Sequence, residues 1–583
     1  MISRFPAALM GLLFAAGLFL MAPMSPAGSA RAPLDAGMFP QSDEAAAWAE
    51  KTLAGMTLEK KIAQLVCADL AGGYIADDDP RLAQWIRLAR DHGLGMFVFY
   101  GGTPRDVAHL LNRLQKEAAI PLLISADFEG GPGQQVAGAS EFPANMGFAA
   151  AAVEGRSMGV PLTYTPVSDI AWRPDNPAEG VRSFGGDLVL MGRLLKAYVR
   201  GYHDNGMQTT AKHFPGRGDV EAMPQSPLWS RISKPAEAVE AQEFKAFQLA
   251  IEAGVDFVMS EHIAVPSVTD GSELPASVEK KLATDWLRGK LGFRGILTSD
   301  DLWYDHVIKR FGAEEVAIKA LEAGHDILLK PKDPVAVIAA VAAAVRSGRL
   351  TEKRIEESAR KLLILKARLD LPKNRFVDEA KVGEFVGTAE HAAIVQEAAD
   401  KSLTMIKNDG LLPLAAGRTA RMVNISVQKI DGDPAPTALA AKLTAAFPET
   451  ASFCLRPDME SAYYDKAWAA VSRADVVVLS LFVARNRLGD ATPFRESDLA
   501  FLYRIIAAKP GAVVAMTYGN PHLIRKIPAV AAYLIGYGEK GWFGNQAVYF
   551  DSFIRALKGE LKPRGRLPIK ISDAYPIGSG VTY

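Results

Sequence analysis

The chain has 583 residues, more than one ordinary domain holds, so the sequence predicts at least two domains. Hydrophobic residues make up 49% of the chain and charged residues 23%, a composition typical of globular proteins. Lysine plus arginine number 66, as do aspartate plus glutamate, so the formal net charge is zero and we expect no nucleic acid as a partner.

The first 30 residues have the pattern of a secretory signal peptide. Arg4 precedes an apolar run from Ala7 to Met21, and small residues at positions 28 and 30 precede a cleavage point after Ala30. An uncleaved membrane anchor is the alternative interpretation. The pattern predicts a periplasmic or secreted protein with no stable membrane insertion after cleavage.

Residues 36–372 alternate short apolar runs with longer helix-like stretches. Uninterrupted apolar strands joined by helices indicate a parallel sheet covered on both faces. Eight such units favour a closed (β/α)8 TIM-type barrel over an open sheet. The predicted strands are 65–69, 96–100, 122–127, 162–166, 208–213, 257–262, 296–300 and 327–330.

Polar or charged residues stand at the C-terminal ends of these runs, which meet at one mouth of a (β/α) barrel and carry catalysis there. Scattered surface charges would not favour strand ends so consistently. The residues concerned are Asp69, Asp127, Lys212, His213, Glu261, His262, Asp300 and Lys330.

A second alternation follows a linker predicted at 373–396. Apolar runs at 421–426, 476–482, 512–517 and 531–535 are again separated by helical patterns. Several strands with no sign of closure predict an open α/β sandwich domain over 397–583. The two cysteines, Cys67 and Cys454, fall in different domains, so we expect two buried thiols and no disulfide framework.

Two pairs of neighbouring residues are the main candidates for chemistry. Asp300 and Asp301 end a predicted strand, and alternation sends them to opposite sides if the strand persists that far, so that one could face the mouth and the other anchor a loop. A carboxylate there serves as nucleophile, base or metal ligand, and a helix N-cap is the alternative. Lys212 and His213 should likewise divide between the mouth and the packing behind it; a Schiff-base lysine is the rival interpretation.

Nucleotide and metal sites find little support in the sequence. The glycine-rich turn after Asp127 lacks the Gly-Lys-Ser/Thr ending of a phosphate-binding loop. His213, His262, His306 and His325 are far apart in sequence, and none forms a close pair on one helix. We therefore expect no cofactor and no catalytic metal.

Several ordered motifs give the chain a resemblance to a known family. They are Asp127-Phe-Glu-Gly-Gly131, Phe142-Pro-Ala-Asn-Met146, Arg182-Ser-Phe-Gly185, Lys212-His-Phe-Pro-Gly216, Leu274-Pro-Ala-Ser277 and Thr298-Ser-Asp-Asp-Leu302. Together they resemble glycoside hydrolase family 3, in particular its β-N-acetylhexosaminidase branch in the two-domain form. Residues 401–413 resemble the opening of the C-terminal α/β sandwich of that family.

The resemblance implies a retaining double displacement through a covalent glycosyl-enzyme. By motif, it makes Asp300 the nucleophile. It also implies that Asp127, Arg182, Lys212 and His213 bind the hydroxyl groups of the sugar.

The sequence departs from this branch where the general acid/base is expected. The branch continues Lys-His-Phe-Pro-Gly-His-Gly and then Asp-Ser-His, whose Asp-His pair transfers the proton. Here Arg217 replaces the first of those histidines, and Met223-Pro-Gln225 stands in place of Asp-Ser-His. The usual Asp-His dyad is therefore missing.

Three interpretations of this loss stay open. Asp219 or Glu221 on the same loop takes over as acid/base; or Glu261, Glu496 of the second domain or another residue does so; or general acid catalysis is absent. The loss of general acid catalysis typically lowers the reaction rate about 10²–10⁴-fold.

Taken together, the sequence predicts an exported retaining β-glycosidase that acts on a carbohydrate substrate. A β-N-acetylhexosaminidase releasing N-acetylglucosamine-type sugars from cell-wall or related glycans is the first hypothesis. A β-glucosidase or β-xylosidase of the same family is the alternative, followed by a catalytically impaired glycan-binding protein and, more remotely, a barrel aldolase using Lys212.

Overall fold

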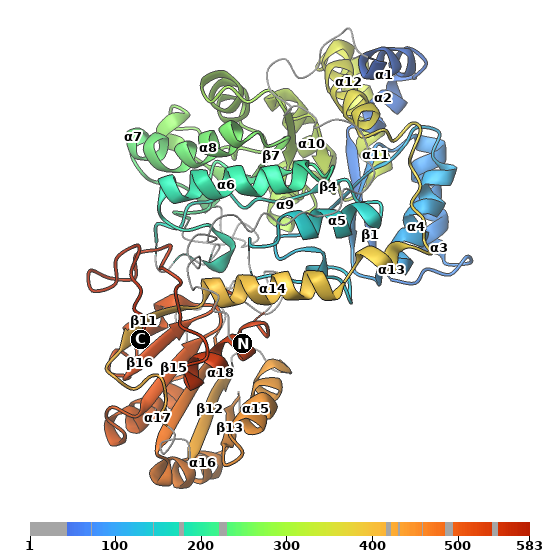
Figure 1. The fold of residues 1–583 in the computed structure, drawn as a ribbon. Coiled ribbons are helices and arrows are strands. Elements are labelled where there is room, and N and C mark those ends of the chain that lie inside the picture. Colours follow the sequence, from blue (N-terminus) through green and yellow to red (C-terminus); the bar gives the residue numbers. More distant parts are fainter. Residues whose placement is uncertain are drawn as a thin grey trace, which may run out of the picture. The chain divides into compact units, whose positions relative to one another are not determined.

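The structure is a computed structural model. Figure 1 shows the course of the chain. It describes residues 44–583 except 72, 144, 174–175, 177–179, 221–229, 416–420, 429–431, 457–458, 484–493 and 539–545. The predicted signal peptide lies outside these residues. Within the described ranges, no helix has the length and apolar character needed to cross a bilayer.

Eight parallel strands close into a barrel, which confirms the predicted (β/α)8 fold. Strand β10 pairs with β1, with Val66 opposite Leu328, and this pairing closes the ring. Single bridges continue the ring elsewhere: Leu162 to Gln208 beside β4 and β5, and Thr298 to Ile327 between β9 and β10. The strands are β1 (Val66–Ala71), β2 (Met96–Tyr100), β3 (Leu123–Ala126), β4 (Leu162–Thr163), β5 (Thr210–Phe214), β7 (Phe257–Ser260), β9 (Ile296–Ser299) and β10 (Leu328–Leu329). A short pair, β6 (Ser230–Arg231) and β8 (Ile263–Ala264), stands outside the ring.

Helices surround the strands and begin where the sequence supplies caps. Helix α4 (Pro104–Glu117) starts after Thr103, whose hydroxyl accepts a hydrogen bond from the Asp106 N–H, with proline in its first turn. The other barrel helices are α3 (Pro80–Arg87), η1 (Leu88–His92), α5 (Ala149–Ser157), α6 (Leu188–His203), α7 (Ala236–Val239), η4 (Glu240–Phe244), α8 (Lys245–Ala253), η6 (Lys281–Lys290), α9 (Asp305–Phe311), α10 (Ala313–Ala323) and α11 (Pro334–Arg346). Helices α1 (Glu44–Ala54), α2 (Leu58–Gln64) and α12 (Glu352–Arg368) pack together beside them (Figure 1).

Alternate strand residues fill the inside of the barrel. A buried cluster there includes Cys67, Met96, Val98, Leu123 and Leu329, which are at most 2% exposed. The intervening strand residues, such as Val66 and Phe97, pack against the helices in the larger core. The inside of the barrel is therefore filled by side chains, most of them apolar, with the hydroxyl groups of Ser125 and Tyr164 hydrogen-bonded to each other.

An ion cluster secures the barrel at the N-terminal start of β10. Asp326 is buried and accepts hydrogen bonds from Arg288 of η6 at 2.6 Å and from the Ser358 hydroxyl of α12 at 2.6 Å. Lys361 of α12 lies 3.1 Å from the same carboxylate. These contacts join the start of β10 to η6 and α12, at the end of the barrel opposite the mouth.

The C-terminal part forms an open sheet of six strands flanked by helices, as predicted. The strand order is β11-β16-β15-β14-β12-β13, and only β11 runs antiparallel to its neighbour. The strands are β11 (Thr404–Asn408), β12 (Met422–Gln428), β13 (Ala451–Leu455), β14 (Val476–Phe482), β15 (Val513–Thr517) and β16 (Ala532–Ile535). The helices are α14 (Ala389–Ser402), α15 (Ala435–Ala446), α16 (Ser461–Arg473), α17 (Glu496–Ala508) and α18 (Tyr549–Lys558).

Two features of this part differ from the sequence-based expectation. Strand β13 is at the edge and begins with two exposed residues, so it lacks the apolar run that marks its neighbours. The stretch 373–396, predicted as a linker, contains α13 (Val382–Phe385) and the start of α14, where the Thr388 hydroxyl caps the helix. The domain boundaries themselves stay a prediction.

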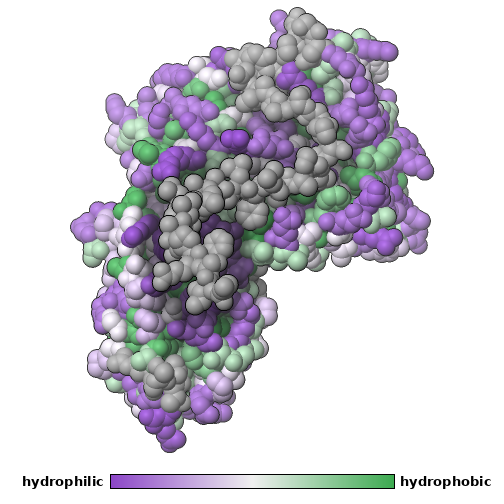
Figure 2. Space-filling view, viewed as in Figure 1, coloured by the Kyte–Doolittle hydropathy of each residue, from purple (hydrophilic) through white to green (hydrophobic). Residues whose placement is uncertain are grey.

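Figure 2 shows the same side of the molecule by hydropathy. Hydrophilic residues cover much of the coloured surface, and hydrophobic ones occur singly or in small groups. Both cysteines are free thiols, as expected, and Cys67 is buried in the barrel. The prediction that Cys454 is buried too was wrong, because it lies on the edge strand β13 and is only partly covered.

Candidate active site

A pocket with a volume of about 250 Å³ opens at the C-terminal ends of the barrel strands. All five residues that the sequence predicted as nucleophile or sugar ligands line it: Asp127, Arg182, Lys212, His213 and Asp300. The structure therefore brings them together, as expected. Their individual roles stay predictions.

Lys212 lies at the centre of the charged network in this pocket. Its ammonium group lies 2.6 Å from Asp127 and 2.7 Å from Glu129, and the side chain is 3% exposed. Burial would lower the pKa of this amine, but Asp127 and Glu129 outweigh it and raise the pKa above its usual value. A permanently protonated amine is no nucleophile, so the Schiff-base interpretation does not fit.

Glu129 belongs to this network, although the sequence analysis did not single it out. Arg182 donates two hydrogen bonds to it, each of 2.9 Å. Burial would raise the pKa of Glu129, but Arg182 and Lys212 lower it to about 2. Its place two residues after Asp127 in the same glycine-rich loop was a signal that could have found it.

His213 is held by a second residue that the sequence analysis missed. Its Nδ1 lies 2.7 Å from Asp169, which also accepts from the backbone N–H groups of His213 and Arg217. Burial, followed by the nearby pocket cations, lowers the pKa of His213 well below its usual value. The ring is therefore neutral at pH 7 and suited to hydrogen bonding a hydroxyl group.

Lys212 and His213 do not divide between the mouth and the packing behind it, because both line the pocket. The pairing of β5 with β7 is irregular between Ala211 and Phe214, so strict alternation does not hold over these residues. The peptide bond between Lys212 and His213 is cis.

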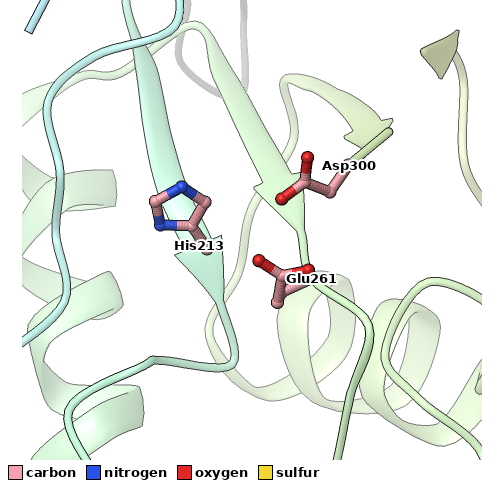
Figure 3. Close-up of side chains that lie close together, drawn as sticks. All are labelled: His213, Glu261 and Asp300. Atoms are coloured by element: carbon pink, nitrogen blue, oxygen red, sulfur yellow. The ribbon is translucent and has the colours of Figure 1, made fainter. Parts of the chain in front are cut away.

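Asp300 follows β9 and points toward His213 and Glu261, as Figure 3 shows. One carboxylate oxygen accepts from the Asp301 N–H at 2.7 Å, and the other accepts from Arg217 at 3.1 Å. Burial raises the pKa of Asp300 to about 7; Glu261 adds to the rise and Arg217 opposes it. Titration near neutral pH is typical of functional carboxyl groups.

Asp301 also lines the pocket, so the two aspartates are not sent to opposite sides. Strand β9 ends at Ser299, so alternation does not extend to the two aspartates. Asp301 forms an ion pair with Lys330 at 2.9 Å and accepts a hydrogen bond from the Trp303 indole at 3.0 Å. Burial raises the pKa of Asp301 to about 6, and Lys330 opposes this rise.

Arg217 replaces the histidine expected from the resemblance and lies on the floor of the site. The side chain is 3% exposed and donates from Nε to Glu261 at 2.7 Å. A ring nitrogen of His213 and one carboxylate oxygen each of Glu261 and Asp300 lie within 4.8 Å of one another, and atoms of these types serve as metal ligands. Arg217 donates to both carboxylates of this group, so a guanidinium already supplies their positive charge.

The acid/base candidates lie less favourably than the nucleophile. Asp219 is not among the residues that line the pocket, and its carboxylate lies 3.8 Å from the Lys234 ammonium group. Glu221, like Met223 to Gln225, lies outside the described residues. Glu261 is fully buried, and Glu496 is an exposed first residue of α17; neither lines the pocket.

An aromatic side chain stands at the rim of the pocket. Trp303 lines it and is 47% exposed, although its indole nitrogen is fixed on Asp301. Tyr304 lies beside it with ring centroids 5.4 Å apart. An indole that is anchored yet open to solvent offers an apolar face for stacking.

Comparison with known proteins agrees with this geometry. Residues 57–365 match the Glycosyl hydrolase family 3 N terminal domain. A Beta-N-acetylglucosaminidase/beta-glucosidase of Cellulomonas fimi is 27% identical, over 93% of this chain and 98% of that protein. A Beta-hexosaminidase of Xanthomonas oryzae pv. oryzae is 32% identical, over 42% of this chain and 78% of that protein.

Solved structures share the fold. A glycoside hydrolase family 3 beta-N-acetylglucosaminidase from Paenibacillus sp. str. FPU-7 has a TM-score of 0.76 and 28% identity, covering 89% of this chain and 99% of that one. The beta-glucoside phosphorylase BglX has a TM-score of 0.80 at 24% identity, over 92% and 98% of the two chains. The chain belongs to glycosyl hydrolase family 3 and is a glycoside hydrolase.

Proposed function

We propose that this protein is an exported retaining β-glycosidase that releases N-acetylglucosamine-type sugars from cell-wall or related glycans. The observation that carries the proposal is the placement of Asp300 in a small pocket together with Asp127, Arg182, Lys212 and His213. The pocket is smaller than the roughly 300–1,000 Å³ sites that enclose drug-sized ligands. Its size favours one sugar unit at a time.

In the proposed reaction, Asp300 attacks the anomeric carbon and forms a glycosyl ester, which water then hydrolyses. Lys212 and Arg182 donate hydrogen bonds to sugar hydroxyls, and Asp127 accepts them. The ion pairs of Lys212 with Asp127 and Glu129 fix these groups before substrate arrives. Fixed donors cost little reorganisation in the transition state.

The sugar and the compartment rest on separate observations. Relatives over most of the chain are named for β-N-acetylglucosaminidase activity, which supports this glycone. The name of the Cellulomonas fimi relative also includes β-glucosidase, so glucose is the second candidate. Export rests on the signal-peptide pattern of residues 1–30 and places the enzyme near cell-wall glycans.

The test is hydrolysis of aryl β-glycosides of N-acetylglucosamine, glucose and xylose by the purified mature protein, with Asp300→Asn as control. An activated aryl leaving group needs little protonation, so this assay reports the nucleophile whatever the acid. Turnover of the N-acetylglucosaminide that disappears in Asp300→Asn supports the proposal. A folded protein that hydrolyses none of the three contradicts it and favours glycan binding without catalysis.

A further inference from the structure

Arg217 is fixed from several directions. Its backbone N–H donates to Asp169 at 2.8 Å, and its carbonyl accepts from the Asn176 amide at 2.6 Å. The guanidinium donates to Glu261 from both Nε and Nη2 and to Asp300 from Nη2. The nucleophile and a second carboxylate therefore share one rigidly held cation.

Glu261 has no role in the reaction proposed above. It follows β7, is fully buried, and is absent from the lining of the pocket. One oxygen accepts from the His262 N–H at 2.7 Å, and the other accepts from Arg217. Burying a carboxylate beside a like-charged nucleophile costs free energy unless a cation is paired with it, and Arg217 provides that pairing.

The charges of these three groups fit the course of a double displacement. With both carboxylates ionised, Asp300, Glu261 and Arg217 together carry one negative charge. In the first step the Asp300 oxygen bonds to the anomeric carbon, and the bond to the leaving oxygen breaks with its electron pair. In the second step water bonds to that carbon, one of its protons passes to solvent, and the electron pair of the broken ester bond returns to Asp300.

Asp300 is thus uncharged while the glycosyl ester exists. Glu261 remains hydrogen-bonded to Arg217 during that time, so the guanidinium keeps a carboxylate partner when Asp300 loses its charge. With Glu261, the pair stays neutral and in place throughout the cycle. The excess negative charge of the free site also complements the positive charge that develops on the sugar.

We propose that Arg217 and Glu261 form a positioning pair for the nucleophile, in which Arg217 orients the Asp300 carboxylate and Glu261 anchors Arg217 and balances its charge in the covalent intermediate. This inference rests on the proposed glycosidase function. Neither residue is expected to touch the leaving group.

Other groups around Asp300 bear on its ionisation. His262 packs beneath it, with Nε2 at 3.0 Å from the Asp301 carbonyl, and Asp301 adds a neighbouring carboxylate. His213 faces it across the pocket. Because Glu261 raises and Arg217 lowers the pKa of Asp300, changing either one should move its titration in a direction opposite to that of the other.

The test is a double-mutant cycle with Glu261→Gln, Arg217→Met and the combined variant, measured as kcat/KM against pH on the aryl glycoside that the wild type hydrolyses. Glu261→Gln should move the acid limb to lower pH. Arg217→Met should move it to higher pH and lower kcat/KM on the order of 100-fold. The combined variant should exceed Arg217→Met in activity and return the limb toward the wild-type position.

Two controls separate positioning from folding. Arg217→Lys keeps the charge and should recover part of the activity lost in Arg217→Met. Arg288→Met removes a partly buried arginine paired with Asp326 at 2.6 Å, far from the mouth, and should leave the acid limb unchanged. Thermal unfolding of each variant identifies any that fails to fold.

An active wild type whose acid limb is the same in all variants, or a combined variant no better than Arg217→Met, would overturn the positioning pair alone. A wild type that hydrolyses no glycoside overturns the glycosidase function and the pair with it. The two failures are therefore distinguishable.

Discussion

Arg182 binds Glu129 through two hydrogen bonds of 2.9 Å, each between a different guanidinium nitrogen and a different carboxylate oxygen. Such a pair is geometrically rigid. Because Glu129 also lies 2.7 Å from Lys212, it links two cations of the sugar-binding network.

Replacing Glu129 with glutamine should therefore weaken both the fold and substrate binding. Removing one partner of a buried ion pair typically costs about 3–5 kcal/mol of unfolding free energy. The depressed pKa of Glu129, about 2, means that its stabilising contribution is present above its unfolded value near 4.5 and is lost as pH falls toward 2. Urea unfolding at pH 7 and pH 3 would check this: the deficit of Glu129→Gln should shrink at the lower pH.

Asp300→Asn should abolish turnover, by roughly 10⁴-fold or more. An activated 2-fluoro glycoside should add one sugar mass to the wild type, and peptide mapping should place it on Asp300. Asp301→Asn should still be labelled at Asp300. Label on any other carboxylate would show that the nucleophile was assigned wrongly.

Asp300→Asn should also stabilise the protein at alkaline pH. Since the pKa of Asp300 is raised to about 7 in the fold from 3.8, the folded state binds more protons between these values, and stability falls as pH rises through them. Asparagine removes this dependence, so the gain in Tm over wild type should be larger at pH 8 than at pH 5. Asp305→Asn, at a side chain that is 85% exposed, is the control and should show no such difference.

Trp303 should determine how well the enzyme accepts a second sugar. Its exposed indole at the rim can stack on a leaving-group sugar, worth on the order of 1 kcal/mol or more. Trp303→Ala should raise the KM for a disaccharide about 10-fold. The KM for a glycosyl fluoride, which has no second ring, should change by less than about 2-fold. Trp303→Phe should retain most of the effect, and Tyr503→Ala, a comparably exposed aromatic on α17, should change neither substrate. An equal rise in KM for the disaccharide and the glycosyl fluoride would exclude this role for Trp303.

The acid/base assignment can be tested with Asp219→Asn and Glu221→Gln. The variant that removes the acid should lose about 10²–10⁴-fold on a substrate with a poor leaving group and little on an activated aryl glycoside. Azide should restore turnover in that variant and yield a glycosyl azide. If neither variant changes the ratio between the two substrates, the proton comes from elsewhere.

The order and the ends of the barrel strands were predictable because continuous apolar runs and terminal charged residues are local patterns. Asp127, Lys212, His213 and Asp300 were found in this way, and they lie in one pocket. The partners of these residues were harder to find. Asp169 and Glu129 contact residues 44 and 53 positions away in the sequence. The glycine-rich loop marks Glu129 as a candidate, but no local pattern reveals the partner of either residue.

Arg217 illustrates the same limit. From the sequence it was visible only as a departure from the expected histidine, with no indication of what it would contact. Its partners, Glu261 and Asp300, follow two other strands, and only closure of the barrel brings the three together.

The cluster around Asp326 has a consequence for engineering the enzyme. Because the strand, η6 and α12 are tied together at the end opposite the mouth, these contacts of the barrel do not involve residues of the pocket. Libraries that randomise the loops around Trp303 leave these contacts intact, and most of their members should still fold. Strengthening that distant end first is a practical route to tolerating the destabilising changes that a new sugar preference requires.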